Sequence, residues 1–101
     1  MKVKELLADK NRWTQNVYAR DAFDTSCGPL EERAICFCII GAIKRCYGDK
    51  ESLEKHLAGV NPVLARIKEH LIEKGLGKDI AYFNDTHTHE EVLAVLEKLD
   101  I

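Results

Sequence analysis

The sequence lacks a long hydrophobic run, an excess of one charge and a secretory leader, and each absence excludes a class of protein. The longest run without polar side chains, Ala34 to Ile43, is half the length that a membrane-spanning helix needs. The 15 basic and 17 acidic residues give a net charge of −2, which argues against nonspecific nucleic-acid binding. The apolar stretch after Met1 is broken by Asp9 and Lys10, so we predict no signal peptide and expect a cytoplasmic protein without membrane association.

Recognisable catalytic and nucleotide-binding motifs are also absent. The chain has no glycine-rich phosphate-binding loop, no P-loop and no nucleophile elbow, and we therefore expect no cofactor. It has no internal repeats and no linkers, so residues 1–101 are predicted to form a single helical domain. In a chain that is expected to stay in the cytoplasm, the four cysteines are predicted to be reduced thiols.

What is present is an apolar segment that predicts a buried central helix over about 30–47. From Ala34 to Ile43 no side chain carries a charge, an amide or a hydroxyl, and a helix that is apolar on every side must be covered on every side. Pro29 precedes this segment as a helix-start signal, and Gly48 follows it as a stop signal. Gly41, inside the segment, indicates a close approach by another part of the backbone.

The remaining segments predict short helices that cover the central one. We expect a mainly α fold, a compact bundle of about five short helices around the central helix, with a possible short β-ribbon near 13–21. For the segment 79–85, one helical turn and a short extended piece both fit. Thr88 followed by Glu91 forms the capping-box pattern of a helix start. The other predicted helices span residues 3–7, 50–58 and 62–74.

Polar residues that could carry chemistry gather before the central segment and before the last helix. One interpretation is a shared pocket in which Arg20 recognises an anion and Asp85 or His89 transfers protons. The other is a hydrogen-bond network, with Arg20 paired to Asp85, that ties two non-helical connections to helix ends. The residue pattern favours this structural interpretation. The candidate polar cluster consists of Arg20, Asp21, Asn84, Asp85, Thr88 and His89.

Two further groups resemble metal motifs. His87 and His89 could share a metal ion with Asp85 as the third ligand, but a histidine in the first turn of a helix is also an ordinary surface residue. Cys36 and Cys38 would point about 200° apart on a helix, so they cannot bind one metal together. We therefore predict no metal site and interpret both cysteines as small buried side chains.

Four motifs in a fixed order give the chain a family resemblance. They are W-T-Q with A-R-D over 13–21, A-x-x-x-C-x-x-G-A-I over 34–43, I-x-x-F-N-D over 80–85, and T-H-E-E-V-L over 88–93. On these motifs the chain resembles an uncharacterised family of small bacterial and phage proteins that is classed as a domain of unknown function. The family often has glycine where this chain has Asn16, and its middle helical segment varies in length. The resemblance implies one cytoplasmic, mainly helical domain and brings no catalytic residues with it.

The sequence is compatible with two functions of different classes. The first is a noncatalytic interaction or regulatory module that binds a protein partner or a second copy of itself; the resemblance adds an expected origin in a phage or mobile element. The alternative is a small enzyme or ligand-binding protein whose polar site is built from Arg20, Asp21, Asn84, Asp85 and His89. Burial separates the two, because residues that are paired with one another and closed off form a scaffold, whereas unpaired atoms in an open cleft form a site.

Overall fold

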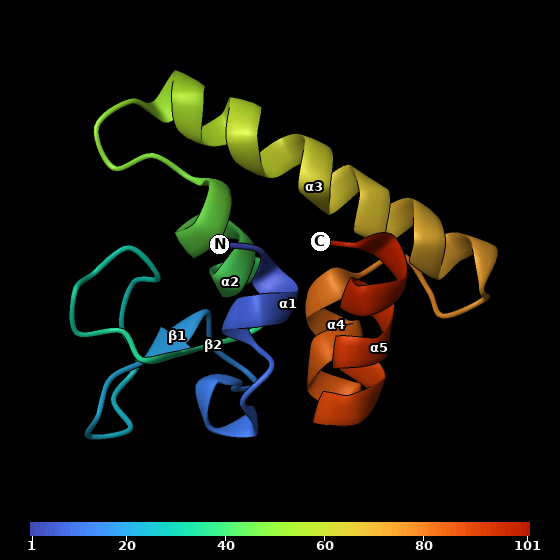
Figure 1. Cartoon of the computed structure of the whole chain (residues 1–101), viewed down its shortest axis with the longest axis horizontal. Coiled ribbons are helices and arrows are strands. Elements are labelled where there is room, and N and C mark those ends of the chain that lie inside the picture. The colour runs from blue at the N-terminus through green and yellow to red at the C-terminus, as the bar shows by residue number, and fades with distance from the viewer.

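The computed structural model describes all residues 1–101. The predicted mainly α fold with a short ribbon is confirmed. In Figure 1, α3 extends along one side of the molecule, and it packs against α2, α4 and α5. The elements are α1 (Val3–Leu6), a 3-10 turn η1 (Lys10–Arg12), β1 (Ala19–Arg20), β2 (Cys36–Phe37), α2 (Ile39–Tyr47), α3 (Leu53–Glu73), α4 (Ile80–Thr86) and α5 (His89–Leu99).

Helix α2 lies at the centre of the core and packs against α1, α3 and α4. Its residues Ile39, Ala42 and Ile43 are completely buried. Phe37 from β2 and Phe83 from α4 are the largest fully buried side chains around it. Full burial of one such side chain stabilises the fold by about 1.5–3 kcal/mol. The position of the apolar segment at the centre of the domain therefore follows from its composition.

The central helix is shorter than predicted, because it begins at Ile39 rather than near 30. Residues 36–37 form an antiparallel ribbon with β1, in which Ala19 faces Phe37. Cys38 is the N-cap of α2, and its Sγ accepts a hydrogen bond from the backbone N–H of Gly41 at 3.3 Å. An apolar run without periodicity fits a buried strand as well as a buried helix, and pairing with β1 makes residues 36–37 a strand.

Helix α3 is one continuous helix, whereas the sequence predicted two over 50–58 and 62–74. It begins after Ser52, whose hydroxyl accepts a hydrogen bond from the N–H of Lys55 at 3.2 Å. Gly59 does not end a helix: a Cβ there would lie only 2.1 Å from the carbonyl oxygen of Tyr47, so the glycine permits contact with the end of α2. Pro62 lies exposed within the same helix. Gly59 and Pro62 both resemble signals that end or start a helix, but the helix continues through both positions.

Other local signals were interpreted correctly. A Cβ on Gly41 would lie 1.9 Å from the carbonyl oxygen of Tyr18, which confirms the predicted close approach of another backbone segment. Thr88 and Glu91 form the predicted capping box at the start of α5, with each side chain accepting from the other's backbone N–H. The segment 79–85 is helical, since Asp79 caps α4 by accepting from the N–H of Tyr82 at 3.0 Å.

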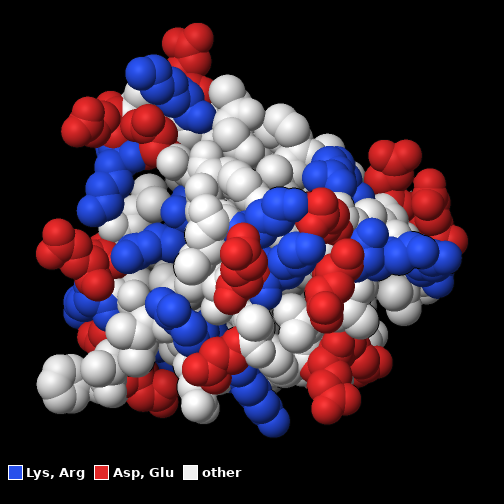
Figure 2. All heavy atoms as spheres, viewed as in Figure 1, with Lys and Arg blue, Asp and Glu red and all other residues white.

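The surface carries charge of both signs. In Figure 2 the Lys and Arg side chains are interspersed with Asp and Glu over the visible face, without a broad field of either sign. None of the helices combines the length and apolar character needed to cross a membrane.

Candidate functional site

Asn84 on α4 is completely buried and joins three segments of the chain. Its side-chain oxygen accepts hydrogen bonds from the indole N–H of Trp13 at 2.8 Å and from the backbone N–H of Ile39 at 3.1 Å. Its side-chain nitrogen donates to the carbonyl oxygen of Thr14 at 3.1 Å and to Oδ1 of Asp85 at 3.0 Å. These four bonds use the full hydrogen-bonding capacity of the amide. Asn84 is therefore part of the scaffold.

The loop that follows Trp13 is attached to the end of α4 by two more residues. The side-chain nitrogen of Gln15 donates to the carbonyl oxygens of Asn84 at 3.1 Å and His87 at 3.2 Å. The backbone N–H of Asn16 donates to Oδ1 of Asp85 at 2.9 Å. Asn16 has φ of 73°, a left-handed conformation that asparagine adopts more easily than most residues. The W-T-Q-N and F-N-D segments, about 70 residues apart in sequence, thus form one hydrogen-bonded unit.

Arg20 does not pair with Asp85, so that predicted contact is wrong. Its Nε donates to the hydroxyl of Thr14 at 3.0 Å, and its Nη1 donates to the carbonyl oxygen of Asp24 at 3.3 Å. Asp85 instead accepts from Asn16 and from the neighbouring Asn84. Local backbone and amide donors satisfy Oδ1 of Asp85, and the guanidinium finds its partners within its own loop.

Asp21 holds a tight turn together. Its Oδ1 accepts from the N–H groups of Phe23 at 2.9 Å and Thr25 at 3.0 Å, and its Oδ2 accepts from Arg33 at 3.3 Å. The hydrogen bond from the Thr25 amide is the main cause that lowers the pKa of Asp21 below its ordinary value. The carboxylate is 9% exposed; Oδ1 closes the turn, and Oδ2 ties the turn to Arg33. At the tip of that turn Phe23 is 89% exposed.

The two histidines of the candidate metal motif contact different parts of the chain. His87 Nδ1 lies 2.8 Å from the carbonyl oxygen of Phe83, and the two rings stack with centroids 4.2 Å apart. His89 is buried, with Nε2 2.6 Å from the carbonyl oxygen of Leu7. No three His, Cys, Asp or Glu side chains of the chain are grouped so that they could hold a metal ion.

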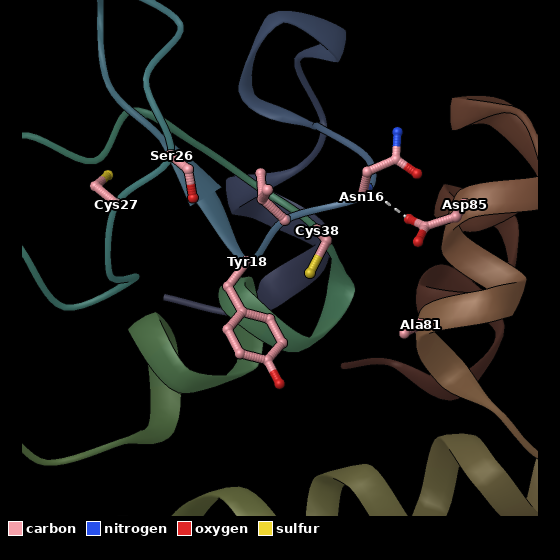
Figure 3. Close-up of a pocket in the computed structure, with 8 residues that line it drawn as sticks. Asn16, Tyr18, Ser26, Cys27, Cys38, Ala81 and Asp85 are labelled. Carbon is pink, nitrogen blue, oxygen red and sulfur yellow. Dashed lines mark hydrogen bonds between the residues drawn. The ribbon is translucent and has the colours of Figure 1, made fainter.

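Thr88 and His89 line a small hollow of about 270 Å³ together with Lys10 and Glu90. Asp85 lines a different pocket, which we call the Asp85 pocket. It has a volume of about 420 Å³ and lies between the loop 16–18 and α4. Figure 3 shows Asp85 and Ala81 on the α4 side, with Tyr18 and the sulfur of Cys38 across from them. The pocket is lined by Asn16, Val17, Tyr18, Ser26, Cys27, Cys38, Ala81 and Asp85. The sequence pattern singled out Asp85 but not Tyr18 or Ala81, since no local signal links these positions.

Asp85 carries the only formal charge among the residues that line the pocket. Its Oδ1 accepts both of the hydrogen bonds described above, whereas its Oδ2 accepts none from the chain and forms no ion pair. An unused carboxylate oxygen at the side of a partly apolar pocket is a recognition element for a donor or a cation.

The thiol in the same pocket is not set up as a nucleophile. Cys38 is only 5% exposed, and burial raises the pKa of its thiol, with the nearby Asp85 carboxylate acting in the same direction. The thiolate is the reactive form of cysteine, so a thiol with a raised pKa in a buried position stays protonated and inert. Its sulfur instead serves as the cap of α2.

Comparison with protein-family models places the chain in a family without an assigned function. Residues 1–99 match the model of a family described as "Family of unknown function (DUF6197)". The match covers nearly the whole chain and confirms the expected membership in a family of unknown function. No curated protein and no solved structure gives a significant match.

Proposed function

Because the chain belongs to this family of unknown function, we propose its role from geometry: a noncatalytic interaction module that docks a protein partner over the Asp85 pocket. The observation that carries the proposal is the difference between Asp85 and the other candidate polar residues. All of them but one are occupied in holding the fold, and the exception, Asp85, keeps a free oxygen in a pocket.

The contacts of the other candidates favour a scaffold over a catalytic centre. Asn84 and Asp21 are buried and bonded to backbone groups, and Thr88 caps a helix. His89 is bonded to the Leu7 carbonyl, and Arg20 to its own loop. A general acid or base must reach a substrate proton within hydrogen-bond distance. Each of these five side chains already forms hydrogen bonds that hold the fold, which favours a structural role.

Two exposed aromatic side chains support a macromolecular partner. Tyr18, at the mouth of the pocket, is 48% exposed, and Tyr82, next to Ala81 on α4, is 66% exposed. Tyrosine is enriched at the energetic centres of protein interfaces, because it offers a large rigid surface with a polar end. A pocket with Tyr18 in its wall and a second exposed tyrosine on the same helix as Asp85 suits a protein surface that covers the pocket and inserts one side chain.

Site-specific photocrosslinking in the native host tests this proposal. A photoreactive phenylalanine analogue at position 18 is expected to yield a discrete protein adduct, whereas the same analogue at exposed Glu69 on α3, outside the pocket, is expected to yield none. Ala81→Trp, which fills the pocket with an indole, is expected to abolish the adduct at position 18. Equal adducts at positions 18 and 69, or an adduct that persists in folded Ala81→Trp protein, would refute docking at this pocket.

A further inference from the structure

We infer that the Asp85 pocket receives the side chain of a lysine from the protein partner. This inference rests on the proposed function and specifies the chemistry of the docked residue. It follows from the charge of the pocket, from the single unused oxygen of Asp85 and from the apolar walls.

The charge of the pocket selects a cation. Asp85 is half-buried, and no Lys or Arg of the chain lies within ion-pair distance of it. Arg20 is held by Thr14 and Asp24, and the ammonium of Lys44 lies over the ring of Tyr18, 4.3 Å from its centroid. A carboxylate in partly apolar surroundings binds a cation more strongly than one in open water does. The chain itself offers Asp85 no cation, so a cationic partner for this carboxylate comes from another molecule.

The geometry of the carboxylate selects lysine over arginine. Oδ1 already accepts from the N–H of Asn16 and from the amide of Asn84, which occupies both of its favoured acceptor directions. A guanidinium binds a carboxylate best through two parallel bonds, one to each oxygen, and here only Oδ2 is free. An ammonium is a compact charge that needs one oxygen. The side-chain amide of Asn16, which forms no hydrogen bond within the chain, lies beside Asp85 and offers a second acceptor (Figure 3).

The walls of the pocket suit the stem of a lysine. Val17, Ala81 and the protonated thiol of Cys38 line the path to Asp85. Lysine buries its methylene groups against apolar surface while its charged end stays among polar groups. The volume of about 420 Å³ lies in the range of pockets that enclose small groups. A norleucine side chain has nearly the same apolar stem without the charge, so it separates the two contributions.

Titration with capped amino acids, followed by amide chemical shifts of Asn16, Ala81 and Asp85 in NMR spectra, tests the inference. The probes are the Nα-acetyl N-methylamides of lysine, norleucine and arginine. Lysine is expected to bind at least about tenfold more tightly than norleucine and several-fold more tightly than arginine. Asp85→Asn is expected to remove this preference without unfolding the protein, because an asparagine oxygen still accepts from Asn16 and Asn84. Glu69→Gln removes the same charge outside the pocket and is expected to leave lysine binding unchanged.

Each other outcome has a definite meaning. Equal binding of norleucine and lysine that is blocked by Ala81→Trp would overturn the lysine inference and leave the docking proposal standing; Val17→Trp serves if Ala81→Trp does not fold. Tighter binding of arginine, or a lysine preference that survives Asp85→Asn, would overturn the assignment to Oδ2. The absence of any shift at about 20 mM probe would overturn lysine recognition, and the crosslinking experiment then decides on the docking proposal by itself.

Discussion

Replacing Asn84 with alanine is expected to destabilise the protein mainly because it removes hydrogen bonds, and only to a lesser extent because it removes packing contacts. The substitution leaves three groups in the protein interior without a partner: the indole N–H of Trp13, the N–H of Ile39 and the carbonyl of Thr14. An unsatisfied buried polar group costs about 1–3 kcal/mol, and two of the three are only part-buried. We therefore expect a loss of about 3–5 kcal/mol, against a total stability of about 5–15 kcal/mol for a domain of this kind.

Urea denaturation followed by circular dichroism measures this loss, and a thermal melt is expected to shift downward by about 12 °C or more. Trp13→Phe removes one of the three stranded groups, the indole N–H, so the double variant Trp13→Phe, Asn84→Ala is expected to be more stable than the sum of the two single losses implies. Asn61→Ala, at an exposed asparagine on α3, is the matched control, with an expected change within about 0.5 kcal/mol. A loss below about 1 kcal/mol for Asn84→Ala would refute the assignment of Asn84 as the joint between the loop and the helices.

Two further substitutions test contacts elsewhere in the fold. Gly41→Ala would favour the helix by about 1 kcal/mol on helix propensity alone, but its Cβ would meet the carbonyl oxygen of Tyr18. We therefore expect the free energy of unfolding, measured by urea denaturation, to fall by about 2 kcal/mol or more. An increase in this free energy would show that the two segments separate easily. Hydrogen bonds and ion pairs with Lys2 and Lys4 lower the pKa of Asp100 from 3.8 to about 2, so the contribution of Asp100 to stability is present above pH 4 and is lost as the pH falls through 2. Asp100→Asn tolerates the same left-handed conformation, with φ of 54°, and its stability difference from the unaltered protein is expected to vanish at the acid end of a pH series; a difference that is independent of pH would contradict this.

The parts of the fold that could be predicted from the sequence are those set by neighbouring residues. The capping box at Thr88 and Glu91 acts within one turn of helix, and it marked the start of α5 correctly. The cost of glycine in a helix made Gly41 informative, and the carbonyl of Tyr18 accounts for it. Both signals have a local physical cause that does not depend on where the rest of the chain lies.

The errors arose where a distant segment decides the local structure. Residues 36–37 are extended because they pair with β1, which lies 17 positions earlier, and the apolar composition alone fits either state. Gly59 resembled a helix end, but it permits the contact with Tyr47 inside one long helix. These contacts join segments that are distant in sequence, so no local sequence pattern indicates them.

In the candidate site, too, local features could be predicted and contacts between distant segments could not. The sequence pointed to the correct segments, since the loop before β1 and the end of α4 are in contact. It did not show which side chains meet there, and the expected partner of Asp85 was wrong. Tyr18, Ala81 and Cys38 share a pocket with Asp85 only because three elements converge at that point.

The left-handed backbone at Asn16 has a consequence for how recognition can diverge among related proteins. Glycine adopts this conformation readily, and asparagine does so with little strain. Exchange between these two residues leaves the N–H bond to Asp85 in place and adds or removes only an amide next to the free carboxylate oxygen. Ligand preference can therefore evolve at this position while the architecture stays the same.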